Sequence, residues 1–326
     1  MNPFRLDRPT TIPAALRLLA SDRQAKVLAG GTDLMTLMRD GVSAPTRLVD
    51  VRRLDLDQLR WRRDGTVHIG ATYSNQLADP RLAAEFPVLA EAIASGASQQ
   101  IRNMATTGGN LLQRTRCTYF RLPEFACNRR SPGSGCAAIA GDSAGQAILG
   151  VSESCNAVHP SDMAVALQAL DAVVQVRNAR GSQAIPIDDF HRLPGGTPQL
   201  ENTLAPDELI IGVELRTGAR SRHSHYVKFR ERTSFAFAVA SAAVAVELRG
   251  DTVVSARVAL GGVAVKPWRA RAAEAALVGH RFDDATIDAA AAAATQGALP
   301  RPDNRYKVEL AREVVRRALT ELGGRR

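Results

Sequence analysis

Aromatic residues and long apolar runs are both scarce in this sequence. Phe, Trp and Tyr make up 5% of the 326 residues while all hydrophobic types make up 45%, so we expect a core of aliphatic side chains. No apolar run approaches the roughly 20 residues that a membrane-spanning helix needs, so we expect no membrane span. Residues 1–7 contain no apolar stretch of signal-peptide length, and we expect a cytoplasmic protein. Export to the periplasm together with a signal-bearing partner stays open.

Cysteine is scarce as well, and it is unevenly distributed. The chain has four cysteines, all within 117–155, and no Cys-x2-Cys pair, which excludes the common zinc-finger spacings. Residues 128–135 include no apolar side chain to bury, so we expect this stretch to need an external constraint. A [4Fe–4S] cluster held by four thiolates is our preferred interpretation, and zinc, two disulfides or free thiols are the alternatives. The predicted metal ligands are Cys117, Cys127, Cys136 and Cys155.

The familiar nucleotide-binding motifs are also absent, since neither Gly-x-Gly-x-x-Gly nor a P-loop occurs. Two Gly-Gly turns are present, at 29–33 after a predicted strand and at 106–110. Paired glycines allow a positive φ and a close backbone approach, and successive free N–H groups form a nest for an anion. The start of a following helix adds its positive dipole end. The two turns are therefore either ordinary chain turns or a pair that clamps a pyrophosphate, and the residues alone leave both open.

The charge pattern limits the classes of partner. The formal charge of +9, from 42 basic and 33 acidic side chains, suits an anionic cofactor or an acidic partner subunit. Arginine is scattered, and no basic motif is interleaved with aromatics, so we expect no nucleic-acid binding. No Ser-His-Asp or Cys-His nucleophile set and no paired carboxylates are legible, so we predict no catalytic residue in this chain.

Hydrophobic periodicity predicts helices and strands in three regions, 1–53, 54–217 and 218–326. The predicted strands alternate in polarity or are rich in β-branched residues, and they are 26–29, 46–51, 67–71, 172–176, 208–215, 225–232, 238–248 and 253–260. The predicted helices are 13–21, 34–39, 80–95, 163–170, 270–277, 287–294 and 306–322. The last three strands are expected to form an antiparallel sheet.

Two charged residues outside the glycine turns are candidates for the same site. Asp162 follows the last cysteine and either caps the helix predicted at 163–170 or bonds a ribose or flavin group. Strand alternation places Lys228 on the face opposite Val227, where it meets either a phosphate, a reduced flavin or solvent. The residues alone leave these alternatives open.

Taken together, these stretches resemble the FAD-binding subunit of the xanthine dehydrogenase family of molybdenum hydroxylases. The resemblance spans essentially the whole chain and is carried by 26–34, 106–110, 161–162, 261–267 and 306–319. Most members of that family lack the stretch at about 114–156 that carries the cysteines, which we call the cysteine segment. A subset has it, with four Cys binding an extra [4Fe–4S] cluster.

Within that subset, the sequence looks most similar to the flavoprotein subunit of bacterial aldehyde oxidoreductases that act on aromatic aldehydes. The likeness rests on 110–117, 132–138 and 159–166. The flavoprotein subunit of 4-hydroxybenzoyl-CoA reductase is the alternative. An alternative of another class is a binding module whose cysteine segment is stapled by zinc, which would be colourless where a flavoprotein is yellow.

The resemblance implies a fold of the vanillyl-alcohol oxidase type, with two FAD-binding subdomains and a C-terminal α+β domain. The subdomains would be 1–53 and 54–217, with an iron–sulfur insertion at about 114–156, and the C-terminal domain would be 218–326. It also implies a [2Fe–2S] subunit and a molybdenum-cofactor subunit as partners. The residues that it implies for FAD are Lys26, Val27, Leu28, Ala29, Gly30, Gly31, Thr32, Asp33, Leu34, Thr106, Thr107, Gly108, Gly109, Asn110, Asp162 and Lys228.

Overall fold

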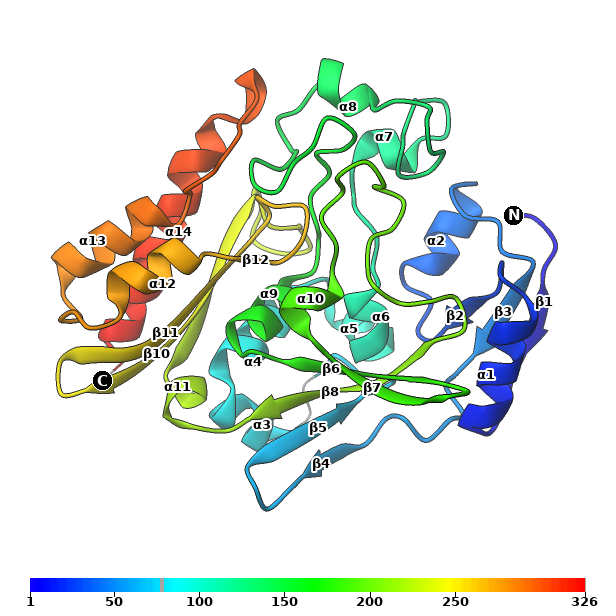
Figure 1. Ribbon diagram of the computed structural model, residues 1–326, viewed down its shortest axis with the longest axis horizontal. Coiled ribbons are helices and arrows are strands. Elements are labelled where there is room, and N and C mark those ends of the chain that lie inside the picture. The colour runs from blue at the N-terminus through cyan, green and yellow to red at the C-terminus, as the bar shows by residue number, and fades with distance from the viewer. Residues whose placement is uncertain (77–78, 326) are drawn as a thin grey trace.

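Three sheets follow one another along the chain in the computed structural model, which describes residues 1–76 and 79–325 (Figure 1). The first is a parallel sheet of β1 (Arg5–Asp7), β2 (Lys26–Leu28) and β3 (Arg47–Asp50), in the order β1-β3-β2. Helix α1 (Ile12–Ser21) and helix α2 (Leu34–Arg39) complete this unit. Strand β1 was not predicted, because its three residues, Arg5, Leu6 and Asp7, include no β-branched side chain.

The second sheet is antiparallel. Its strands are β4 (Leu59–Trp61), β5 (Thr66–Gly70), β6 (Val173–Asn178), β7 (Gly181–Pro186) and β8 (Leu209–Arg216), and they lie in the order β4-β5-β8-β6-β7. Between β5 and β6 the chain leaves the sheet over residues 71–172 and then returns to it. That excursion carries the second glycine turn and all four cysteines.

Short helices accompany this sheet and its excursion. They are α3 (Pro80–Glu85), α4 (Pro87–Ser95), α5 (Gln99–Met104), α6 (Thr107–Leu111), α7 (Thr118–Arg121), α8 (Ala137–Ala140), α9 (Asp162–Ala169) and α10 (Ile187–Phe190). The single helix predicted at 80–95 was wrong, because Pro87 starts a new helix and Phe86 adopts φ −139° and ψ 65° between the two. Helix α9 is buried on every side from Met163 to Ala169, so it anchors the core beneath the site.

The third sheet is antiparallel, and three helices cover one face of it (Figure 1). The strands are β9 (Ser224–Phe229), β10 (Ala240–Arg249), β11 (Thr252–Gly261) and β12 (Trp268–Arg269), in the order β12-β11-β10-β9, and the helices of this region are α11 (Ala219–Arg222), α12 (Arg271–Leu277), α13 (Asp284–Ala293), η1 (Pro302–Asn304) and α14 (Tyr306–Gly323). Helix α14 buries an aliphatic face that includes Val314, Val315 and Leu319, as its period predicted.

The cysteine segment is tied to this C-terminal core. Ile148 and Leu149 are fully buried in the apolar cluster of the third sheet, and Leu149 forms a parallel bridge with Ala264. The end of the segment is therefore held by residues more than a hundred positions later. The domain boundary predicted between residues 217 and 218 stays a prediction. Ile148 and Leu149, which precede it, pack with residues that follow it.

The first glycine turn is in backbone contact with the residues just before the second turn. A Cβ atom on Gly30 would lie 1.8 Å from the carbonyl oxygen of Met104, the last residue of α5, and 2.6 Å from its carbonyl carbon. Because backbone atoms cannot yield as a side chain does, only glycine fits here. The first turn therefore packs directly against the residues that lead into the second turn.

We predict that Gly30→Ala pushes the two turns apart and lowers the free energy of unfolding by about 1–3 kcal/mol, the usual cost of overpacking. Chemical denaturation measures this, and FAD retention after gel filtration reports the effect on the turns. Gly196→Ala is the control, because nothing lies within 4 Å of its added methyl group. Equal stability of both variants would show that the close approach is not required.

Candidate functional site

The first glycine turn presents free backbone amides at the start of a helix. It follows β2, Gly31 adopts φ +71°, and α2 begins three residues later. Within the described residues, the amides of Gly30, Gly31, Thr32 and Asp33 have no hydrogen-bond acceptor. Such a row of free N–H groups next to a helix N-terminus is suited to a phosphate group.

The Asp33 carboxylate forms ion pairs with two arginines and accepts a hydrogen bond from a backbone amide. One carboxylate oxygen lies 3.0 Å from Nη1 of Arg116 and 2.7 Å from Nη2 of Arg121, and the other accepts from the backbone N–H of Arg114 at 2.8 Å. The carboxylate therefore joins the first turn to the start of the cysteine segment. These contacts fix the position of the carboxylate, and its predicted part in binding FAD stays a prediction.

The second glycine turn forms helix α6, and its amides are already paired. Thr107 N–H donates to the carbonyl of Tyr73 at 3.0 Å, and Gly108 N–H to that of Ala71 at 2.8 Å. The Thr106 hydroxyl caps the helix by accepting from Gly109 N–H at 3.3 Å. The second turn is therefore not a second nest of free amides, because the helix and the chain that follows β5 consume them. It supports the first turn and supplies side chains.

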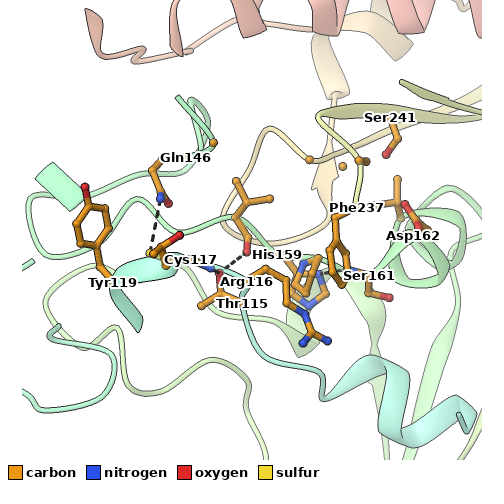
Figure 2. A pocket seen from close by; sticks show the side chains of 18 of the residues that line it. Thr115, Arg116, Cys117, Tyr119, Gln146, His159, Ser161, Asp162, Phe237 and Ser241 are labelled. Carbon is orange, nitrogen blue, oxygen red and sulfur yellow. Dashed lines mark hydrogen bonds between the residues drawn. The ribbon is translucent and has the colours of Figure 1, made fainter. Parts of the chain in front are cut away.

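A cavity of about 430 Å³ lies where the cysteine segment meets the C-terminal sheet (Figure 2). Its volume is in the range of small-molecule sites. The glycine-turn residues 26–34 and 106–110 do not line it, so the candidate site has two separate parts. Side chains from segments far apart in sequence form the wall, among them Arg116, Cys117, Gln146, His159, Ser161, Asp162, Phe237 and Ser241.

Asp162 and Lys228, both predicted from the sequence, form a buried ion pair beside this cavity. Lys228 Nζ lies 2.7 Å from one carboxylate oxygen of Asp162, and the hydroxyl of Tyr226 donates to the other at 2.6 Å. The Lys228 side chain is 3% exposed and that of Asp162 is 10% exposed. Burial, and then the charge of Asp162, raise the pKa of Tyr226 well above its ordinary value, so the phenol stays protonated.

The cap of helix α9 is Ser161, whose hydroxyl accepts from Ala164 N–H at 2.9 Å. Asp162 is thereby released from capping and faces the cavity. The Ser161 hydroxyl also donates to Oδ1 of Asn110 at 2.5 Å, so one serine connects α9 to the second glycine turn.

The four cysteines are free thiols that come together from distant parts of the segment. No disulfide joins them, and Cys127 and Cys136 form an antiparallel bridge. Burial and then the charges of Cys155, Cys117 and Cys127 raise the pKa of Cys136 to about 11. The four groups thus affect one another electrostatically. Even so, among residues 1–76 and 79–325 no set of three or more Cys, His, Asp or Glu side chains is arranged as a ready metal site.

Polar groups surround the thiols. Nη2 of Arg129 lies 3.6 Å from Sγ of Cys155, which also accepts from Ala157 N–H at 3.5 Å. Nε2 of Gln146 lies 3.6 Å from Sγ of Cys117, and a dashed line marks this hydrogen bond in Figure 2. Donors aimed at sulfur stabilise a thiolate, which is the form that binds metals.

Arginine is in excess over carboxylate in this segment. Arg116 and Arg121 share Asp33, while Arg114 and Arg129 share Glu201. Each carboxylate therefore meets two guanidinium groups, which leaves positive charge beside the cysteines. Such an excess fits a group that carries negative charge.

Comparison with known proteins identifies the family. The domain described as "FAD binding domain in molybdopterin dehydrogenase" matches residues 2–215, and "CO dehydrogenase flavoprotein C-terminal domain" matches 224–322. The chain belongs to the FAD-binding medium subunits of the molybdenum hydroxylase family. It is therefore a subunit of an FAD-dependent oxidoreductase, and the α+β fold predicted from the sequence is confirmed.

Two curated relatives and one solved structure illustrate the match. The chain is 44% identical over 325 residues to the aldehyde oxidoreductase FAD-binding subunit PaoB of Escherichia coli K12, covering 98% of both chains. It is 26% identical to the glyceraldehyde dehydrogenase medium chain of Sulfolobus acidocaldarius, covering 96% of this chain and 94% of that one. A carbon monoxide dehydrogenase from Hydrogenophaga pseudoflava, which lacks the Mo-pyranopterin moiety of the molybdenum cofactor, aligns with a TM-score of 0.78 at 27% identity, covering 99% and 98%.

These relatives are medium chains or FAD-binding subunits of enzymes with several subunits. Over the part of the chain that the structure describes, no helix is long and apolar enough to span a membrane.

The sequence patterns did not reveal several residues of the site. Tyr226 lies two positions before Lys228 on β9, and strand alternation, which puts both on one face, is the signal that could have found it. Ser241 pairs with Lys228 across β9 and β10, and only the strand register reveals this. Glu201 lies in the long loop between α10 and β8, and no motif in the neighbouring sequence marks it as a site residue.

We predict that Lys228→Met lowers the free energy of unfolding by about 3 kcal/mol, because it leaves the Asp162 carboxylate buried without its cation. Arg62→Met is the matched control, since Arg62 pairs with Glu214 but is 53% exposed. That control should cost less than about 1 kcal/mol. Urea denaturation of both variants gives the comparison, and similar losses would contradict a buried pair.

Proposed function

We propose that this chain is the FAD and [4Fe–4S] electron-transfer subunit of a molybdenum-dependent aldehyde oxidoreductase. The 44% identity to an aldehyde oxidoreductase FAD-binding subunit, over 98% of both chains, is the observation that carries the aldehyde assignment. It favours aldehyde oxidation over the reduction of 4-hydroxybenzoyl-CoA. The excess of arginine around four convergent thiols supports the cluster.

The residues of the site fit FAD. The free amides of the first turn would receive the diphosphate, and the cavity beside Asp162 would receive the isoalloxazine ring. The residues implied by the family, 26–34, 106–110, Asp162 and Lys228, remain our proposed FAD ligands. When bound, FAD accepts electrons and passes them to an external acceptor.

The chain's own part is to hold and orient the cofactor. Tyr226 and Lys228 fix the Asp162 carboxylate in one position, and burial keeps the Tyr226 phenol protonated. These groups set a constant electrostatic environment in the wall of the cavity. In the cavity wall the Ser161 hydroxyl is bonded to Asn110 and Ala164, and the Asp162 carboxylate to Tyr226 and Lys228, so these groups would position and tune the cofactor.

Cys117, Cys127, Cys136 and Cys155 would ligate the [4Fe–4S] cluster. Four free thiols, sulfur-directed donors and surplus arginine fit the charge of such a group. Closing the thiols onto one metal site requires local adjustment of the segment, since they are not yet arranged as a ready site. A bound cluster supplies one-electron transfer.

A [2Fe–2S] subunit and a molybdenum-cofactor subunit are the proposed partners. The relatives are medium chains of larger enzymes, and the Hydrogenophaga enzyme is one to which a molybdenum cofactor belongs. Oxidation of the aldehyde would take place on the molybdenum subunit, and electrons would reach this chain through the [2Fe–2S] subunit. A cytoplasmic location, or export together with a signal-bearing partner, stays a proposal.

The purified complex is expected to contain one FAD per copy of this chain and about four irons beyond those of the [2Fe–2S] clusters. The FAD content is measured by absorbance after the flavin is released at acid pH. The iron content is measured by mass spectrometry. Zinc in place of the additional iron would overturn the cluster assignment, and a colourless chain would overturn the flavin assignment.

Cys136→Ser should remove the additional iron and reduce the yield of soluble protein, because the segment loses a ligand. FAD should remain in the fraction that folds, since Cys136 does not line the cavity. Ser131→Ala is the control, because Ser131 is an exposed residue of the same loop. Unchanged iron content in Cys136→Ser would remove this cysteine from the ligand set.

A further inference from the structure

Arg129 is a buried cation directed at a cysteine. It follows Cys127 by two residues, is 7% exposed, and places Nη2 3.6 Å from Sγ of Cys155. Arginine is seldom buried to this degree unless it is paired. Its second contact is the salt bridge of Nη1 with Oε2 of Glu201 at 2.9 Å.

The pairing with Glu201 does not neutralise the local charge. Nε of Arg114 lies 2.6 Å from the other oxygen of Glu201, so two guanidinium groups share one carboxylate. Arg114 also stacks over the ring of Phe120, with 4.4 Å between its Cζ and the centroid. Positive charge therefore remains beside Cys155.

The adjacent arginine has a different role. Arg130 donates to the backbone carbonyls of Tyr119, Phe120, Pro123 and Phe125, and the described structure shows no bond from it to a thiol. Arg130 therefore holds the loop together. Arg129 instead contacts the Glu201 carboxylate and the Cys155 sulfur, so its positive charge acts directly on a thiol.

We propose that Arg129 raises the reduction potential of the cluster held by the four cysteines, and that Glu201 limits this effect. The inference rests on the [4Fe–4S] assignment of the proposed function. Reduction adds one electron to a group that already carries four thiolates, so negative charge grows next to Arg129. A nearby cation and a donor to sulfur both stabilise the reduced form.

The two charges predict opposite shifts. Arg129→Gln removes the cation. At a fixed potential, the ratio of oxidised to reduced cluster should then rise at least tenfold. A tenfold change corresponds to about 59 mV for one electron. Glu201→Gln removes the neighbouring anion and should shift the midpoint potential upward. Arg129→Lys keeps the charge and should lie closer to the wild type than Arg129→Gln.

The experiment is a redox titration of the whole complex, followed by electron paramagnetic resonance of the reduced cluster. Opposite shifts in Arg129→Gln and Glu201→Gln support the proposal, because a general disturbance of the loop would move both the same way. Shifts of one sign, or none, would overturn it. If Arg129→Gln loses its cluster, Glu201→Gln and Arg129→Lys decide the question. A wild type without the cluster signal would instead overturn the proposed function.

Discussion

The carboxylate of Asp33 is the contact on which the arrangement of the site depends. It lies at the end of the nest of free amides and binds two guanidinium groups and one backbone N–H from the start of the cysteine segment. Arg116 extends the connection, because its guanidinium also lies 4.8 Å from the ring of Phe237 in the cavity wall. One acidic residue thus fixes the distance between the amide nest, the cysteines and the cavity.

The second constraint is the register of the C-terminal sheet. Ser241 of β10 lies opposite both Lys228 of β9 and Gly261 of β11, so three strands meet at the cavity. A slip of one residue would turn Lys228 away from Asp162 and leave a carboxylate buried alone. The sheet that looks like a separate domain in Figure 1 therefore completes the wall of the site.

Residues 128–135 of the cysteine segment carry no apolar side chain, and polar contacts order this part of it. Arginines bind carbonyls, carboxylates and a sulfur atom, and Ile148 and Leu149, which precede Cys155, are buried in the C-terminal core. Through Arg114 and Arg129 these contacts reach Glu201, which lies far away in the sequence.

The sequence, with the resemblance that it carries, determined the α+β class, the C-terminal helix, most of the strands, the first glycine turn and the set of four cysteines. Local signals carried these features, because a hydrophobic period, a Gly-Gly pair after a strand and a cluster of one residue type all lie in short stretches. Only the tertiary structure decided that the amides of the second turn are already paired, that Asp33 serves the arginines, and that Glu201, Tyr226 and Ser241 belong to the site. Those facts depend on contacts between segments far apart in sequence, and no local pattern records which partner a polar group will find.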